Sequence, residues 1–169
     1  MFEGAVTHIG EADIVLRIIL ATVLSSIVGI ERELHHKPAG LRTNVMVGLG
    51  SCLFTLVSIR AADVFPTLTA IDPTRIAAQI VTGIGFLGAG TILFEKDRSS
   101  VIGLTTAATL WVVAAVGTAI GMGLYLEAIV GTLMVFFTFL VLSKVVNEVR
   151  KRSTDHDEHG DTAMEGNKQ

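Results

Sequence analysis

The sequence has little of what secreted domains and metalloenzymes use for stability and chemistry. Its 169 residues include one cysteine, three prolines and one tryptophan, and 17% of them are charged. The single cysteine, Cys52, excludes a disulfide within the chain, and because it lies in an apolar stretch we expect it to be a small packing residue. Residues 1–13 contain no Lys or Arg, so they do not resemble a cleaved signal peptide, which needs a basic start.

Catalytic signatures are also missing. The chain contains no GxxxxGK(S/T) phosphate-binding loop, no HExxH pattern and no CxxC pair, so neither ATP hydrolysis nor a catalytic metal is expected. We predict that the protein is not an enzyme, holds no cofactor and binds no nucleic acid. No carboxylate lies near the middle of an apolar stretch, which argues against a self-contained ion pump. Backbone carbonyls freed near glycines remain an alternative lining for an ion path.

Long apolar stretches make up most of what is present. Half of the residues are hydrophobic and the mean hydropathy is +0.61. Charges are nearly excluded from five windows long enough to cross a bilayer as helices. We therefore predict an all-α, polytopic transmembrane helical bundle of about five spans. The spans are expected at residues 14–30, 44–59 or slightly beyond, 75–94, 101–120 and 124–142.

Lys and Arg residues predict the orientation of these spans. Nine of them would lie on one side of a five-span protein: Arg32, Lys37, Arg42, Lys96, Arg98, Lys144, Arg150, Lys151 and Arg152. Three would lie on the other side: Arg17, Arg60 and Arg75. This puts the N-terminus outside and the C-terminus in the cytoplasm. Residues 1–143 are predicted to form the transmembrane domain, and residues 144–169 a basic cytoplasmic flank with a disordered acidic tail.

The third predicted span is unusually rich in glycine. Gly83, Gly85 and Gly88 match the GxGxxG dinucleotide fingerprint, but they lie inside one apolar span with no acidic residue about 20 positions further on. With Gly90 they are better explained as a helix-packing face, because small residues let helices approach closely in lipid. We therefore predict that this span is the most tightly packed helix.

Other spans carry related patterns. Residues spaced by four share one helix face in each of three spans: Ala21, Ser25 and Gly29; Asn44, Gly48 and Cys52; Gly117 and Gly121. The small residues among them predict helix contacts. Arg17, near the start of the first span, is expected to snorkel to the interface and not to be a buried charge.

Polar residues that are candidates for function lie at the ends of the spans. They are Glu31, Arg42, Asp72, Arg75, Gln79, Thr105 and Thr106. The threonines are more simply explained by bonds back to the helix backbone.

Each of the other candidates also has a structural interpretation. Asp72 before a proline is a helix-start signal, and Arg75 can pair with Asp72 or Asp63 at the outer surface. Glu31 and Arg42 can form a clasp across the first cytoplasmic loop. Gln79 lies one turn deeper than Arg75 on the same face, and a helix contact and a ligand contact remain equally open for it.

Five segments, taken in order, resemble the MgtC/SapB family. They are Gly29-Ile-Glu-Arg-Glu33, Lys37-Pro-Ala-Gly-Leu-Arg-Thr43, Asp72-Pro-Thr-Arg-Ile-Ala-Ala-Gln79, Gly83-Ile-Gly-Phe-Leu-Gly-Ala-Gly90, and Gly103-Leu-Thr-Thr-Ala-Ala108 with Trp111. The resemblance covers roughly residues 10–143, and five segments in this order are highly specific. It implies a multi-pass protein of the bacterial inner membrane linked to Mg²⁺ homeostasis, growth in low Mg²⁺ and, in pathogens, virulence.

The family is also labelled as part of a transport ATPase, which this sequence does not support. Its longer members carry a soluble C-terminal domain, and we expect this chain to be the membrane-only form. Mg²⁺ is then its substrate or its signal.

Two functions stay open: a transporter of Mg²⁺ or another small ion, and a non-transporting regulator that binds another membrane protein. The expected partners are the lipid bilayer, other copies in a homo-oligomer, and a second membrane protein.

Overall fold

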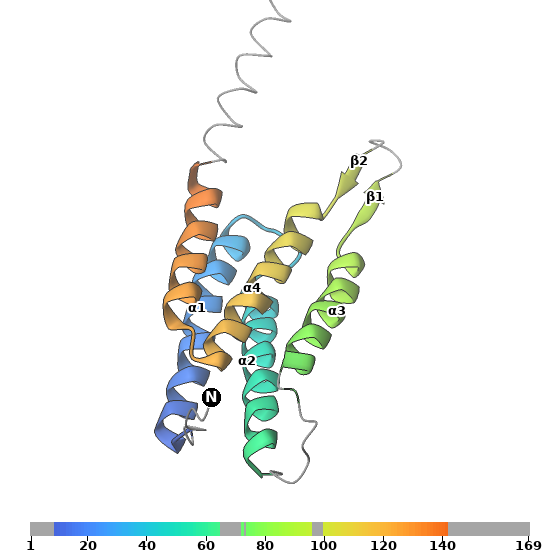
Figure 1. Ribbon diagram of the computed structural model, residues 1–169. Coiled ribbons are helices and arrows are strands. Elements are labelled where there is room, and N and C mark those ends of the chain that lie inside the picture. The colour runs from blue at the N-terminus through green and yellow to red at the C-terminus, as the bar shows by residue number, and fades with distance from the viewer. Residues whose placement is uncertain (1–8, 65–71, 73, 96–99, 142–169) are drawn as a thin grey trace, which may run out of the picture. The chain divides into compact units, whose positions relative to one another are not determined.

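The computed structural model describes residues 9–64, 72, 74–95 and 100–141, and the elements in this part of the chain are mostly helices (Figure 1). In chain order they are α1 (Glu11–Leu34), α2 (Leu41–Val64), α3 (Thr74–Gly90), β1 (Leu93–Glu95), β2 (Ser100–Ile102), α4 (Leu104–Met122) and the helix Tyr125–Val141. The flank and tail predicted for residues 144–169 lie outside the described residues, as do Lys96 and Arg98.

Three helical segments are long and apolar enough to cross a membrane: Glu11–Leu34, Leu41–Ala61 and Leu104–Met122. Two shorter apolar helices, Arg75–Gly90 and Tyr125–Val141, coincide with the remaining predicted spans. Each of the five predicted stretches is therefore helical over most of its length, with strand residues at the end of the third and the start of the fourth. The number of spans and their orientation stay predictions.

The prediction of a purely helical chain is wrong between α3 and α4. There β1 and β2 form a two-stranded antiparallel sheet in which Leu93 pairs with Ile102. The third span was expected to stay helical to Phe94, but α3 ends at Gly90. Glycine is a poor helix former, and the residues beyond it are β-branched or aromatic, which favours strands. The hairpin ends at Gly103, whose φ of +92° and contact with the Thr91 carbonyl leave no room for a side chain.

The side chains of α1 are distributed as expected for a helix in lipid. One stripe carries large apolar side chains that are 39% to 55% exposed: Val15, Ile19, Val23 and Ile27. The opposite face buries smaller residues, including Ala21, Ser25 and Val28. A helix in water would show the reverse pattern, because there the large apolar residues are buried.

The core lies where α1, α2, α4 and the start of the last helix meet. Its buried members are Ala21, Cys52, Leu56, Val116, Ile120 and Ala128. Cys52 is fully buried, so its predicted role as a packing residue is confirmed.

The closest backbone approach joins α2 and α4. A Cβ placed on Gly117 would lie 2.1 Å from the Gly48 carbonyl oxygen, and one on Gly121 would lie 2.6 Å from the Thr55 Cβ. On the other side of α2, a Cβ on Gly48 would collide with the Ser25 hydroxyl. The predicted small-residue contacts of these helices are therefore confirmed, and they depend on glycine.

The prediction that the glycine-rich span is the most tightly packed helix is wrong within one chain. No atom lies within 4 Å of a Cβ built on Gly83, Gly85 or Gly90, and one on Gly88 would meet Ala107 at an ordinary 3.5 Å. Most residues of α3 are exposed, and Phe86 is 82% exposed. Glycine permits close approach, but it does not itself attract a neighbour. Contacts between these glycines and another chain stay a prediction.

Candidate functional site: a buried polar cluster between the first two long helices

The first cluster of polar residues forms where α1 ends and α2 begins, at the upper end of both helices in Figure 1. The Glu33 carboxylate accepts a hydrogen bond of 2.9 Å from the Leu41 backbone N–H. This satisfies one of the amide groups that the first turn of a helix leaves without a partner. The loop of residues 35–40 is thereby fastened at both ends.

Asn44 holds the same loop from below. Its side chain is fully buried, and its Nδ2 donates to the carbonyls of Ala39, at 2.9 Å, and Gly40, at 2.8 Å. Gly29 makes room for it, since a Cβ there would lie 3.2 Å from the Asn44 Cβ. The Oδ1 atom is buried without a hydrogen-bond partner among the described residues. Asn44 therefore keeps one oxygen available inside the protein.

Glu31 and Arg32 form a buried ion pair beside this loop. They are 8% and 4% exposed, and Arg32 Nε lies 2.9 Å from Glu31 Oε2. The His35 Nδ1 lies 3.1 Å from Glu31 Oε1 and 2.8 Å from the Glu31 backbone oxygen. Glu31 Oε2 makes the ion pair without hydrogen-bond geometry, so it can still accept a hydrogen bond. Among the carboxylates whose burial the structure describes, Glu31 is the buried one.

Two more predicted candidates lie at the start of α4, at the same end of the molecule (Figure 1). Thr105 and Thr106 are in the first turn, as predicted. Thr106 is 2% exposed, whereas Thr105 is exposed and its carbonyl accepts a 2.7 Å hydrogen bond from Thr109.

The remaining candidates are not part of this cluster. The predicted clasp between Glu31 and Arg42 is wrong, because Arg42 is exposed on α2 and Glu31 pairs with Arg32. Asp72, Arg75 and Gln79 lie at the start of α3, and all three are exposed. This part of α3 lies beside the middle of α2, where Gln79 lines a groove with Phe54. The Arg75 backbone N–H donates to the Asp72 carbonyl at 3.2 Å, which agrees with a helix start near Asp72.

Sequence reasoning missed a second cluster, around Arg17. Its side chain is 11% exposed and lies 2.6 Å from the Asp13 carboxylate. Arg17 also donates to the Gly121 carbonyl at 2.7 Å, and the Tyr125 hydroxyl donates to Asp13 at 2.7 Å. The interpretation of Arg17 as a snorkelling anchor is therefore wrong. It ties α1 to the last turn of α4.

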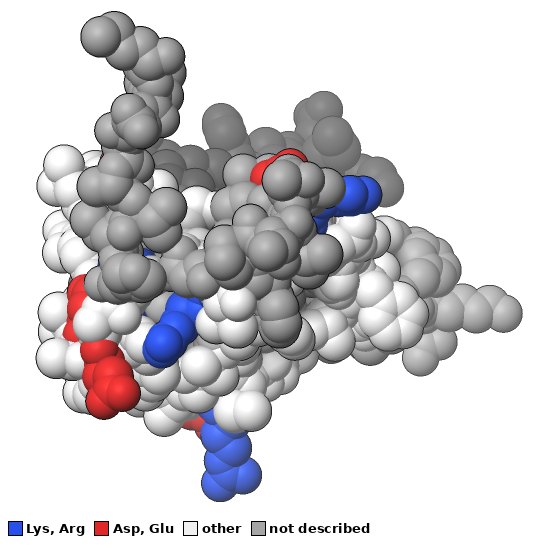
Figure 2. Space-filling view, turned by 60° about the horizontal axis from the view of Figure 1, so that its bottom comes forward, with Lys and Arg blue, Asp and Glu red and all other residues white. Residues whose placement is uncertain are grey.

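In the part of the chain that the structure describes, no three His, Cys, Asp or Glu side chains are placed to hold a metal ion together. The described surface is largely uncharged in the view of Figure 2. Apolar helices with outward-facing large side chains, glycine-mediated contacts and polar clusters at the helix ends define a small helical membrane protein.

The sequence comparisons give the family. The profile of the MgtC family matches residues 18–148, and this chain belongs to that family. The protein named "Putative magnesium transporter YhiD" of Escherichia coli K12 is 48% identical over 133 residues, which are 78% of this chain and 60% of YhiD. Protein SapB of Bacillus subtilis is 42% identical over 82% of this chain and 60% of SapB.

Protein MgtC of Salmonella typhimurium LT2 is 37% identical over 81% of this chain and 55% of its own length. The chain thus spans less than two thirds of each of these relatives. No solved structure gives a significant match.

Proposed function

We propose that this protein acts in magnesium homeostasis in the bacterial inner membrane and carries Mg²⁺ across it. The observation that carries the proposal is the 48% identity with the protein named "Putative magnesium transporter YhiD". The apolar helices and the family membership support a membrane role of this kind.

Glu31 is the residue we assign to the ion. Mg²⁺ is a hard cation that usually keeps several waters and binds through one or two carboxylates. Glu31 offers a buried carboxylate, and Asn44 offers a buried amide oxygen near the same loop. Because Arg32 lies 2.9 Å from Glu31 Oε2, Mg²⁺ and the guanidinium compete for this oxygen. Ion binding is then coupled to the position of Arg32.

The test is Mg²⁺ flux into liposomes that contain only this purified protein and an internal Mg²⁺ indicator, with and without a membrane potential. We expect saturable flux above that of empty liposomes. Glu31→Gln, measured on protein shown to be folded, should lower it at least tenfold, whereas Glu127→Gln, which changes an exposed carboxylate on the last helix, should leave it unchanged.

Absence of flux from folded protein would overturn the transport proposal. The alternative would then be a non-transporting regulator of another membrane protein. Normal flux in Glu31→Gln would remove Glu31 from the pathway but keep the transport proposal.

A further inference from the structure

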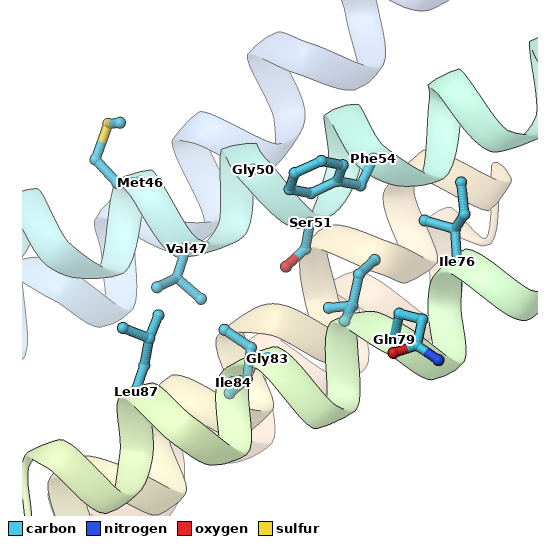
Figure 3. Close-up of a pocket in the computed structure, with 11 residues that line it drawn as sticks. Met46, Val47, Gly50, Ser51, Phe54, Ile76, Gln79, Gly83, Ile84 and Leu87 are labelled. Atoms are coloured by element: carbon cyan, nitrogen blue, oxygen red, sulfur yellow. The ribbon is translucent and has the colours of Figure 1, made fainter.

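An apolar groove of about 530 Å³ lies between α2 and α3 (Figure 3). Its walls include Val47 and Phe54 on α2 and Ile84 and Leu87 on α3. Glycines keep it open, because Gly50 and Gly83 line it and no atom lies within 4 Å of a Cβ built on either. The volume is in the range of about 300–1,000 Å³ that small-molecule sites occupy.

The side chains along α3 change in character from one end of the groove to the other. Arg75 is exposed in the first turn, and none of the described residues forms an ion pair with it. Gln79, on the same helix face one turn later, lines the groove, and its amide is visible at the groove edge in Figure 3. From Ile80 to Leu87 the α3 residues of the lining are apolar or glycine.

A phospholipid carries charged, hydrogen-bonding and apolar groups in an order that matches the residues along α3. Its phosphate is anionic, its ester carbonyls accept hydrogen bonds, and its acyl chain is apolar. With a helix rise of about 1.5 Å per residue, Arg75 and Leu87 lie about 18 Å apart along α3, which is long enough to accommodate an extended acyl chain. The guanidinium group suits a phosphate because it can make two parallel hydrogen bonds to it.

The groove is too small to enclose a transmembrane helix. A helix with its side chains is about 10 Å across, so a segment as long as the groove would need more than twice its volume of 530 Å³ and could only lie across its opening. A single hydrocarbon chain is the occupant whose width, length and polarity agree with the lining.

We propose that the α2–α3 groove is a specific binding site for an anionic phospholipid. One acyl chain lies in the groove, the Gln79 amide donates to an ester carbonyl, and Arg75 binds the phosphate. The lipid fills the apolar space between α2 and α3, and it thereby fastens α3 to the rest of the helices. The site is independent of the proposed ion transport.

The test uses a fluorescent reporter placed in the groove. In the full chain, Trp111→Phe removes the single native tryptophan, and Phe54→Trp introduces one at the groove wall, where Phe54 is 62% exposed and has room. The protein is reconstituted into phosphatidylcholine vesicles in which part of the lipid is brominated phosphatidylglycerol or brominated phosphatidylcholine. We expect the brominated phosphatidylglycerol to quench the introduced tryptophan with at least threefold higher relative affinity.

Two matched pairs of variants locate the site. Arg75→Gln should abolish the headgroup preference, whereas Arg60→Gln, which removes an exposed arginine near the end of α2, should keep it. Gly83→Leu should fill the groove and lower quenching by both lipids. Gly85→Leu, which changes a glycine with equally open space outside the groove lining, should not.

Equal quenching by the two lipids, or an equal effect of Arg75→Gln and Arg60→Gln, would overturn the proposal. Unchanged quenching in Gly83→Leu would do the same. If the reporter chain does not fold, native mass spectrometry of the unmodified chain from equimolar phosphatidylglycerol and phosphatidylcholine gives the answer. Retention of phosphatidylglycerol that Arg75→Gln removes supports the site, and unselective retention overturns it.

Discussion

At the scale of single residues, two pairs of opposite charges lie against the helices, and one of them is buried. Glu31 lies against Arg32, and Arg17 lies against Asp13. A charge buried alone in a low-dielectric interior costs several kcal/mol, whereas a pair compensates for much of that cost. Glu31 and Arg32 are 8% and 4% exposed. Removing either charge alone should therefore destabilise the protein.

A double-substitution cycle tests this dependence. Arg32→Met should lower the free energy of unfolding by about 3–5 kcal/mol, because it leaves the Glu31 carboxylate buried without its counter-charge. Adding Glu31→Gln to Arg32→Met should restore most of the loss. Thermal unfolding in detergent micelles, followed by circular dichroism, measures both.

Arg42→Met is the matched control. Arg42 is exposed, so its substitution should change the free energy of unfolding by no more than about 0.5 kcal/mol. Equal losses in the single and the double variant would show that Glu31 and Arg32 are not energetically coupled.

The ability of the sequence to predict these contacts depended on sequence separation. The shared face of Asn44, Gly48 and Cys52 was predictable, because residues four apart on one helix are neighbours whatever the fold. The partners of Arg17 across the fold were not, since Gly121 is 104 positions away and Tyr125 lies 112 positions from Asp13. The sequence predicted that Glu31 pairs with Arg42, whereas in the structure it pairs with Arg32. Both residues lie near the end of α1, and adjacent residues on a helix do not normally face each other, so helix periodicity does not predict this pair.

At the scale of helices, the position of each glycine decides which helices touch. Gly48 and Gly117 bring α2 and α4 into backbone contact, whereas Gly83 and Gly85 on α3 have open space. Composition alone predicted that α3 is the most tightly packed helix, because it carries the densest run of glycines. The difference comes from the partner surface, since close packing in lipid needs small residues on both helices at the same level.

Gly117→Leu should therefore separate α2 from α4. Its Cβ alone would lie 2.1 Å from the Gly48 carbonyl oxygen, and overpacking a core commonly costs about 1–3 kcal/mol or more. We expect a fall in the detergent melting temperature and aggregation during size-exclusion chromatography. Gly85→Leu is the control and should behave as the unsubstituted chain, because its Cβ meets no atom within 4 Å. Equal behaviour of the two variants would contradict the assignment of the α2–α4 contact.

The Arg17 cluster joins elements in a different way. Arg17 connects α1 to the last turn of α4 through the Gly121 carbonyl, and the Tyr125 hydroxyl donates a hydrogen bond to Asp13. Arg17→Met should remove this connection and lower the melting temperature more than Arg60→Met, which changes an exposed arginine. Differential scanning fluorimetry of the two variants is the measurement. A larger effect of Arg60→Met would mean that the cluster does not hold α1 in place.

At the scale of the whole molecule, the polar clusters lie at two ends of α1 and α2. Glu31 and its loop lie at one end, and Arg17 lies near the other end of α1 (Figure 1). The start of α3 lies beside the middle of α2, where Gln79 and Phe54 line one groove. In the predicted five-span arrangement, nine basic residues lie on the side of Glu31 and three on the other side. The positive-inside rule then predicts that the Glu31 end faces the cytoplasm. With this predicted orientation, the proposed Mg²⁺ contact lies at the cytoplasmic face and the proposed Arg75 lipid site lies in the outer leaflet.

Labelling of single cysteines tests that orientation. In a Cys52→Ser background, Glu11→Cys and His36→Cys introduce thiols at exposed positions at the two ends of α1. A membrane-impermeant maleimide added to spheroplasts should label Glu11→Cys at once and His36→Cys only after the cells are lysed. Because both residues are exposed, a difference in labelling reports the side of the membrane and not burial. The reverse labelling pattern would place Glu31 outside. The proposed Mg²⁺ contact would then lie at the outer face, and the proposed lipid site would lie in the inner leaflet.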